Sequence, residues 1–142
     1  MFRLSSEPIE NWKGTVAPSS GAVVTFDGHV RDHNEGKRVL SLSYEAFNEL
    51  AESEGKLVLE EARQRFALVS AQCAHRTGAL KIGDVAVRVE CQSSHRGAAF
   101  EACEWVIDEV KRRVPIWKKE FYEDGESAWI NAASGALERQ AK

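Results

Sequence analysis

The chain has 142 residues, of which 43% are hydrophobic and 29% are charged, and its formal net charge is −3. This length supports one domain with a substantial core and is short for two. The acidic balance argues against general nucleic-acid binding, which is typical of strongly basic domains, so any cationic site must be local. We expect a single domain over residues 1–142, with its core at about residues 21–132.

The cysteines and the N-terminus bear on the compartment. Cys73, Cys91 and Cys103 show no paired spacing; two fall in apolar strand patterns and one on a helix face. We therefore expect buried thiols in a reducing compartment. The N-terminus lacks the apolar core of a signal peptide, and no apolar run has the length of a membrane span. These features predict a cytoplasmic protein with no membrane contact.

The first half of the chain reads as a loop, two strands and a helix. Breakers such as Pro8 and Gly14 leave only a short helix or turn near Ile9–Trp12. The β-forming residues 22–31 predict a strand with a bulge at Gly28. Turn formers follow at 32–37, and a second β pattern at 39–44 suggests that the two strands form a hairpin. Helical spacing of apolar residues then predicts a helix over 48–68.

The second half is predicted to contain two strands, a helix and two further strands. We expect a strand at 69–77, a turn-bounded connection at 78–84, a strand at 85–91, a helix over 96–113, and strands at 117–122 and 128–130 around a hairpin turn at 123–126. Residues from about Ala133 onward are expected to fray. The order predicts an α+β fold with mostly antiparallel pairing and two main helices.

Basic residues surround a proline near the end of the second helix. Proline lacks an N–H and disfavours helical geometry in the residue before it, so the helix must end before Pro115. Lys111, in the last helical turn, and Lys118, in the extended segment, can then converge from different elements. Such convergence suits an anionic ligand or a reactive lysine. The alternative is a solvated basic helix end that complements the helix dipole.

Further cations lie at predicted element ends. His95 and Arg96 follow two serines where a strand gives way to a helix, which predicts an anion pocket with a capping serine, or an ordinary N-cap with exposed side chains. Arg31 ends a strand before a polar loop, where a surface role is the alternative. His75 and Arg76 are interpreted as structural residues.

Several functional classes are not supported. The four-residue spacing of His29 and His33 would suit a pair of metal ligands on a helix, but these residues are predicted to lie on a strand and in the loop after it. No further ligand is evident, so we expect no metal. Phosphate-binding glycine loops and a nucleophile elbow are missing from the sequence. Five cationic residues remain. Together they would form an electropositive pocket, which would attract an anionic substrate and lower the pKa of a buried lysine. They are Arg31, His95, Arg96, Lys111 and Lys118. A lysine tuned in this way can act as an acid, base or nucleophile.

Several motifs in consistent order resemble the large, catalytic subunit of molybdopterin synthase. They are residues 21–36 (GAVVTFDGHVRDHNEG), 42–46 (LSYEA), 75–78 (HRTG), 94–96 (SHR) with Ala99-Phe100, and 111–120 (KRRVPIWKKE). The likeness covers about residues 21–130 and leaves the first twenty residues and the tail outside.

The resemblance implies an α/β-hammerhead-type fold and a homodimer of this chain. It also implies a small ubiquitin-like sulfur-carrier subunit, whose C-terminal Gly-Gly thiocarboxylate donates sulfur twice to cyclic pyranopterin monophosphate to form the dithiolene of molybdopterin. Lys111 and Lys118 align with the catalytic lysines, while Arg31, His95 and Arg96 align with residues that bind the pterin phosphate or the carrier terminus. No cofactor is implied. A groove for the carrier tail is expected at strand edges or near residues 116–121.

Two other functional classes stay open at this stage. The same cations could serve a non-enzymatic module that binds an anionic metabolite or a partner tail. The four tryptophans and a long amphipathic helix could instead belong to a structural oligomerisation subunit. Nucleic-acid binding is disfavoured by the net charge and by the lack of a basic stripe with interleaved aromatic residues.

Overall fold

The computed structural model describes residues 1–131. Its helices are α1 (Asn48–Arg65) and α2 (Arg96–Arg113). Its strands are β1 (Phe2–Ser5), β2 (Ala22–His29), β3 (His33–Asn34), β4 (Lys37–Ala46), β5 (Ser70–Arg76), β6 (Gly78–Lys81), β7 (Val85–Ser93), β8 (Ile116–Tyr122) and β9 (Ser127–Asn131). The α+β class with two main helices and mostly antiparallel sheet is confirmed, with β1 and β5 as a parallel pair.

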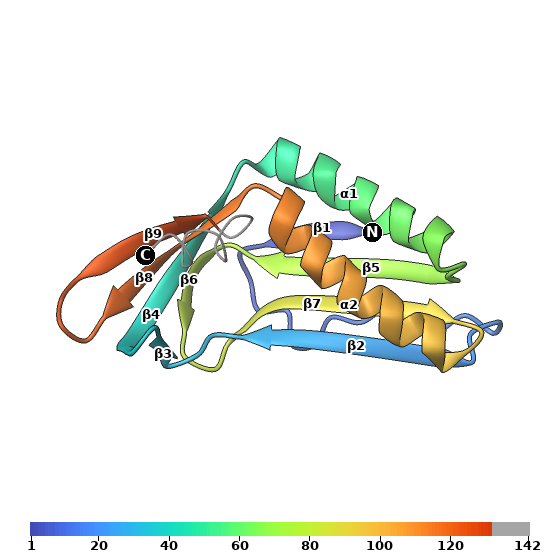
Figure 1. Cartoon of the computed structure of the whole chain (residues 1–142), viewed down its shortest axis with the longest axis horizontal. Coiled ribbons are helices and arrows are strands. Elements are labelled where there is room, and N and C mark those ends of the chain that lie inside the picture. Colours follow the sequence, from blue (N-terminus) through green and yellow to red (C-terminus); the bar gives the residue numbers. More distant parts are fainter. Residues whose placement is uncertain (132–142) are drawn as a thin grey trace.

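The first sheet has the strand order β1-β5-β7-β2, and both helices cover one of its faces (Figure 1). The main core lies between this sheet and the two helices, because the small or branched residues on the inner faces of α1 and α2 meet the apolar face of the strands. Phe2 of β1 packs directly on Gly55 of α1, where an added Cβ would lie 2.2 Å from the Phe2 ring. The glycine in this helix is therefore required by close packing.

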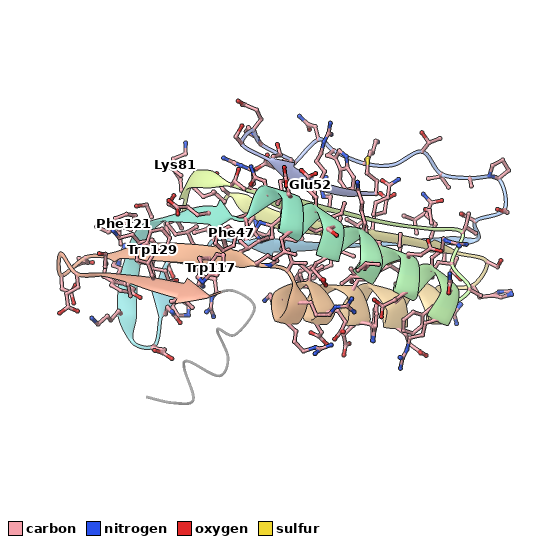
Figure 2. The ribbon with its side chains drawn as sticks, turned by 90° about the horizontal axis from the view of Figure 1, so that it is seen from above. Phe47, Glu52, Lys81, Trp117, Phe121 and Trp129 are labelled. Carbon is pink, nitrogen blue, oxygen red and sulfur yellow. The ribbon has the colours of Figure 1, made fainter. Side chains whose placement is uncertain are left out.

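The second sheet has the order β3-β4-β8-β9, with β6 also paired to β4. It extends beyond the end of the helical layer, at an angle to the first sheet (Figure 1). Its outer side carries exposed aromatic residues, among them Phe121 and Trp129, with 38% and 51% of their surfaces accessible (Figure 2). Trp117 contacts Phe47 edge-on, with ring centroids 5.0 Å apart.

The predicted hairpin between residues 22–31 and 39–44 is wrong. β2 pairs with β7 in the first sheet, whereas β4 pairs with β6 and β8 in the second. The polar loop does form a hairpin, but between β3 and β4, through a tight turn in which Glu35 and Gly36 both have positive φ. Alternating patterns identify strands but leave their partners open, and here the chain changes sheets after His29.

Other sequence predictions hold with smaller differences. The predicted bulge at Gly28 is confirmed by a register shift between Gly28 and His29. The hairpin between β8 and β9 is also confirmed. The first helix ends at Arg65, earlier than predicted, because Phe66 leaves helical geometry and Ala67 adopts φ of 50°. The segment at 78–84, predicted as a connection, contains β6.

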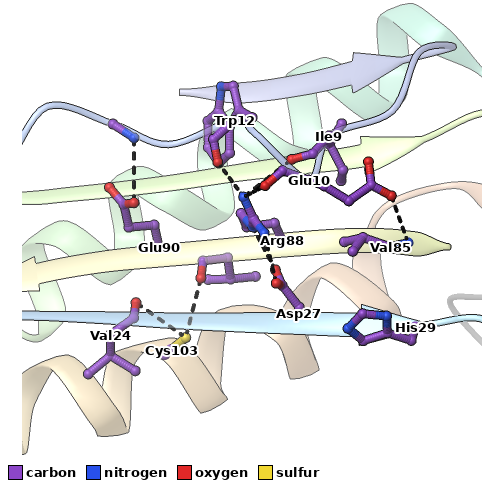
Figure 3. Close-up of polar contacts among 12 residues, drawn as sticks. Ile9, Glu10, Trp12, Val24, Asp27, His29, Val85, Arg88, Glu90 and Cys103 are labelled. Carbon is purple, nitrogen blue, oxygen red and sulfur yellow. Dashed lines mark hydrogen bonds and ion pairs between the residues drawn. The ribbon is translucent and has the colours of Figure 1, made fainter. Parts of the chain in front are cut away.

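The N-terminal segment is more structured than predicted. It begins with strand β1, and Ile9–Trp12 forms a turn closed by the Trp12 N–H and the Ile9 carbonyl. The segment then crosses the face of the first sheet opposite the helices (Figure 3). There the Arg88 guanidinium pairs with Asp27 and donates to the backbone carbonyls of Ile9, Glu10 and Trp12. One half-buried arginine thus holds in place a segment whose own sequence has no periodic pattern.

Three remaining predictions concern the cysteines, the tail and membrane insertion. Cys73, Cys91 and Cys103 are buried free thiols, as predicted. The predicted fraying from Ala133 lies outside the described residues. Within residues 1–131, neither helix is both long and apolar enough to cross a bilayer.

Candidate functional site

A pocket of about 400 Å³ lies where the end of α2 meets both sheets. Its cationic lining residues are Arg31, Lys111 and Lys118, from the loop after β2, from α2 and from β8. The predicted convergence of the two lysines is therefore confirmed. Val114, in extended geometry before Pro115, redirects the chain from the helix into β8 and so brings both sides of the proline to one cavity.

Lys118 occupies a defined position within the second sheet. It lies opposite Tyr44 of β4 and opposite Ile130 of β9, and all three residues line the pocket. Since neighbouring residues along a strand point to opposite faces, Lys119 faces the other side, where its ammonium lies over the Phe121 and Trp129 rings. Only one of the two consecutive lysines therefore serves the pocket.

A buried carboxylate holds Lys118. Glu120, with 4% of its surface accessible, lies two residues along the same strand face, and its Oε2 is 3.4 Å from the Lys118 Nζ. Its Oε1 accepts hydrogen bonds from Asn34 Nδ2 at 2.6 Å and from the Tyr122 hydroxyl at 2.9 Å. The carboxylate is thus fixed by two neutral donors, and the lysine ammonium is its remaining ionic partner among the described residues.

Two further polar side chains line the same pocket. Burial, with a smaller effect of the Glu120 charge, raises the pKa of Tyr44 to about 12, so its hydroxyl stays protonated at neutral pH. Burial also lowers the pKa of His75 to about 4, and the nearby positive charge of Lys111 contributes. The His75 imidazole is therefore neutral at physiological pH. The two rings meet edge-on, with centroids 4.9 Å apart.

Arg31 enters the pocket because the end of β2 departs from regular pairing. At Gly28 an added Cβ would come within 2.9 Å of the Val87 side chain, so only glycine fits the bulge without displacing its neighbour. Val30 then exchanges backbone hydrogen bonds with Gly83 and Asp84. The next residue, Arg31, is exposed, and within residues 1–131 its side chain has no hydrogen bond or ion pair.

His95 and Arg96 do not line this pocket. They lie at the N-terminal end of α2 and are exposed, about 22 Å along the helix axis from Lys111. The predicted serine cap is also wrong, since His95 is the N-cap residue and makes no side-chain cap hydrogen bond. The expectation that five cations share one cavity therefore fails within a single chain, because the rigid helix separates them.

Sequence reasoning missed Tyr44, His75 and Glu120 as site residues. All three lie in segments that carry the family resemblance, but the sequence assigns no role to Tyr44 and Glu120 and only a structural one to His75. For His75 and Glu120, the usable signal would have been a polar residue at an inward-facing strand position, where burial requires a partner. That signal becomes visible only when the strand register is known.

The family model described as MoaE protein matches residues 4–113 of this chain. Its match begins nearer the N-terminus than the resemblance suggested and ends before Lys118. Curated relatives bear the name molybdopterin synthase catalytic subunit, and a match that covers nearly the whole chain includes Lys118. One from Staphylococcus carnosus is 40% identical over 137 residues, covering 94% of this chain and 91% of its own. One from Pyrococcus abyssi is 46% identical over 112 residues, covering 79% and 75%.

Solved structures agree with these matches. The crystal structure of molybdopterin synthase from Staphylococcus aureus superposes with a TM-score of 0.81 at 36% identity, covering 90% of this chain and 93% of that one. A structure described as a protein–protein complex of subunits 1 and 2 of molybdopterin-converting factor, from Helicobacter pylori, has a TM-score of 0.65. At 23% identity it shares the fold, with 84% of this chain and 82% of that one covered.

Proposed function

Because the chain belongs to the MoaE family of molybdopterin synthase catalytic subunits, we propose that it transfers sulfur from the C-terminal thiocarboxylate of a small carrier subunit to cyclic pyranopterin monophosphate. The product is the dithiolene of molybdopterin. The observation that supports this activity most directly is the pocket in which Arg31, Lys111 and Lys118 converge from three elements.

Electrostatics explains why this reaction needs such a pocket. The substrate carries a phosphate and the carrier ends in a thiocarboxylate, so the two reactants repel each other. Positive side chains around one cavity offset that repulsion and hold both groups in reacting geometry. Apolar residues such as Ile107 and Ile130 complete the lining and lower the local dielectric, which strengthens these interactions.

The two lysines have different surroundings and therefore different proposed roles. Lys118, beside the fixed carboxylate of Glu120, contacts the thiocarboxylate and assists sulfur transfer by proton transfer or charge stabilisation. Lys111 and Arg31, at the exposed rim, bind the phosphate and the charge that develops during the reaction. The chemistry needs no metal or organic cofactor, so none is proposed.

We also propose the assembly that the resemblance implies, a homodimer with one ubiquitin-like carrier at each end. His95 and Arg96 lie too far from the pocket of their own chain, so a role in substrate binding requires that they reach the pocket of the second copy. The exposed aromatic residues of the second sheet are typical of a surface that contacts another protein.

The groove for the carrier tail has two candidate places. β8 is flanked by β4 and β9, so residues 116–121 offer no free strand edge, but Ile116 and Lys118 line the pocket. The tail either enters along the open side of the pocket or adds to an outer strand. The cytoplasmic location of the protein remains a prediction from its sequence.

The test combines the purified chain, a thiocarboxylated carrier and cyclic pyranopterin monophosphate, with dithiolene formation as the readout. Lys118→Ala should lower the rate by about 100-fold or more while carrier binding stays largely intact, because a group acting on the transferring sulfur is lost. Lys81→Ala is the matched control, since Lys81 is an exposed lysine of the second sheet that does not line the pocket. Near-normal turnover in Lys118→Ala would refute the assigned role.

Two outcomes would favour other functions. Substrate binding without sulfur transfer, unaffected by Lys118→Arg, would indicate a binding module, because arginine keeps the charge but cannot exchange a proton. Full function after joint replacement of all five cations would indicate a structural subunit.

A further inference from the structure

The chain has two tyrosines, and their hydroxyl groups have different surroundings. The Tyr122 hydroxyl donates a hydrogen bond to Oε1 of Glu120 at 2.9 Å. The Tyr44 hydroxyl has no hydrogen-bond partner among residues 1–131, although the Tyr44 side chain is half-buried and packs against two core clusters. Tyrosines in such positions ordinarily pair their hydroxyl groups, so Tyr44 is an exception.

The Tyr44 hydroxyl is open to solvent. Within the described part of the chain, the fully buried side-chain atoms that lack a hydrogen-bond partner belong to Ser70, Gln72 and Arg76. The Tyr44 oxygen also lacks a partner but is not one of these atoms, so it keeps some contact with solvent. Because Tyr44 lines the pocket, its hydroxyl is available to a ligand bound there.

The ring that carries this hydroxyl is held in place. The His75 ring contacts it edge-on, and apolar residues of both core clusters pack against it. In the ladder between β4 and β8, Tyr44 lies directly opposite Lys118, so the two side chains share one face of the sheet. Since its pKa is raised to about 12, the hydroxyl keeps its proton at neutral pH and can donate it to a hydrogen bond.

A thiocarboxylate has two different ends, an oxygen and a sulfur, and only the sulfur must reach the pterin. The Lys118 ammonium is a compact charge with rotatable donors, so it attracts either end. A hydroxyl on a fixed ring donates in a narrow range of directions, and oxygen accepts such a hydrogen bond better than sulfur does. Lys118 therefore supplies charge, whereas Tyr44 can supply direction.

We propose that Tyr44 orients the thiocarboxylate of the carrier: its hydroxyl donates a hydrogen bond to the terminal oxygen, which leaves the sulfur to face the pterin. This inference rests on the proposed function and deepens it by adding a neutral substrate contact to the cationic pocket. No covalent bond forms or breaks at the hydroxyl, so Tyr44 keeps its proton during sulfur transfer.

The first test observes this hydrogen bond without the reaction. A carrier labelled with carbon-13 at its terminal thiocarboxyl carbon is bound to the full-length chain without the pterin, and infrared difference spectroscopy measures the C–O stretching frequency. A hydrogen bond to the oxygen weakens the C–O bond, so the frequency should be lower with the unmodified chain than with Tyr44→Phe. Equal frequencies would overturn the proposal.

Ser43→Ala is the matched control. It also removes a hydroxyl from β4, but neighbouring residues of a strand point to opposite faces, and Ser43 does not line the pocket. The C–O frequency with Ser43→Ala should equal that with the unmodified chain. A shift as large as that of Tyr44→Phe would show that the frequency does not report on the Tyr44 hydroxyl, and would refute the proposal.

The second test measures sulfur transfer. Tyr44→Phe should lower kcat about 10- to 100-fold, the size of a lost hydrogen bond to a charged group, and should leave the KM for the pterin unchanged, because the hydroxyl contacts the carrier. Ser43→Ala should change neither value. A raised KM for the pterin with an unchanged kcat would assign the hydroxyl to the pterin phosphate and refute the proposal, as would normal kinetics in Tyr44→Phe.

Thermal unfolding separates these effects from damage to the fold. Tyr44→Phe keeps the ring that contacts His75, so its unfolding midpoint should stay close to that of the unmodified chain. If the unmodified chain transferred sulfur and Tyr44→Phe did so equally fast, only the role of Tyr44 would fail. If the unmodified chain transferred no sulfur, the proposed function would fail, and the infrared comparison would still decide whether the hydroxyl contacts the carrier terminus. A carrier that did not bind at all would overturn both.

Discussion

The two ends of α2 both carry cations, but within residues 1–131 only those at the C-terminal end line the candidate pocket. At the C-terminal end, Lys111 meets the second sheet and shares a cavity with Lys118 and Arg31. At the N-terminal end, His95 and Arg96 are exposed and lie outside this pocket. Charge at a helix end is therefore not sufficient for a site; a second layer must surround it with fixed, partly apolar walls.

The helix dipole sharpens this contrast. The C-terminal end of a helix carries partial negative charge, so Lys111 is favourably placed there and the bound anion must rely on side chains. The N-terminal end carries partial positive charge, so Arg96 in the first turn is placed against the dipole. Because Arg96 weakens the helix at this position, its placement is consistent with a role in binding.

The largest expected effect comes from mixing two inactive chains. If the N-terminal end of α2 serves the pocket of a second copy, Lys118→Ala and Arg96→Ala should each be nearly inactive alone, and subunit exchange between them should restore about a quarter of the normal activity. Half of the dimers are then mixed, and each mixed dimer has one intact site. No recovery, with exchange verified by mass spectrometry, would contradict a shared site.

A second test removes the charge that holds Lys118. Glu120→Gln can still accept hydrogen bonds from Asn34 and Tyr122, but it loses the ionic contact with the lysine, so sulfur transfer should fall about 10- to 100-fold. Glu126→Gln is the control, because it breaks the exposed pair with Lys37 on the hairpin of the same sheet. Equal activity in the two variants would show that Glu120 does not position Lys118.

A third test concerns stability at the pocket end. The pKa of His75 falls from 6.5 to about 4 on folding, so the unfolded chain binds more protons between these pH values. The folded state should lose about 3 kcal/mol of stability from this group as the pH falls from 6.5 to 4, and nothing further below. Denaturant unfolding at several pH values should show this loss, and His75→Gln should remove it. An unchanged pH profile in His75→Gln would contradict a neutral, buried ring.

The smallest effect is expected at the other end of the helix. Arg96→Gln should stabilise the chain slightly, by about 0.3–1 kcal/mol, because it removes a positive charge from the first turn of α2. Thermal unfolding measures this gain, and the same variant should lose activity. A loss of stability would indicate that Arg96 has a structural partner instead.

The sequence predicted local elements better than their partners. Helical spacing located both helices, and Pro115 correctly separated Lys111 from Lys118. The hairpin prediction failed because the residues at 22–31 and 39–44 alternate equally well in either sheet, and only tertiary packing decides which strand they meet.

The residues of the candidate site also differ in whether the sequence could predict them. Lys111 and Lys118 could be predicted because their spacing is local. The role of Glu120 could not, because its hydrogen-bond donor Asn34 lies 86 residues away along the chain. His75 looked structural because the bond that fixes its tautomer is to a backbone carbonyl. Such partners appear only when the strand register places them together.

Arg31, Lys111 and Lys118 line one pocket, and we propose that this pocket binds the substrate phosphate. Calorimetric titration of the free chain with cyclic pyranopterin monophosphate measures that binding without the reaction. Arg31→Ala and Lys111→Ala should each weaken binding about tenfold or more, since each removes a charged contact to the phosphate, while Lys81→Ala, outside the pocket, should leave it unchanged. Unaltered binding in both pocket variants would show that these cations do not bind the substrate.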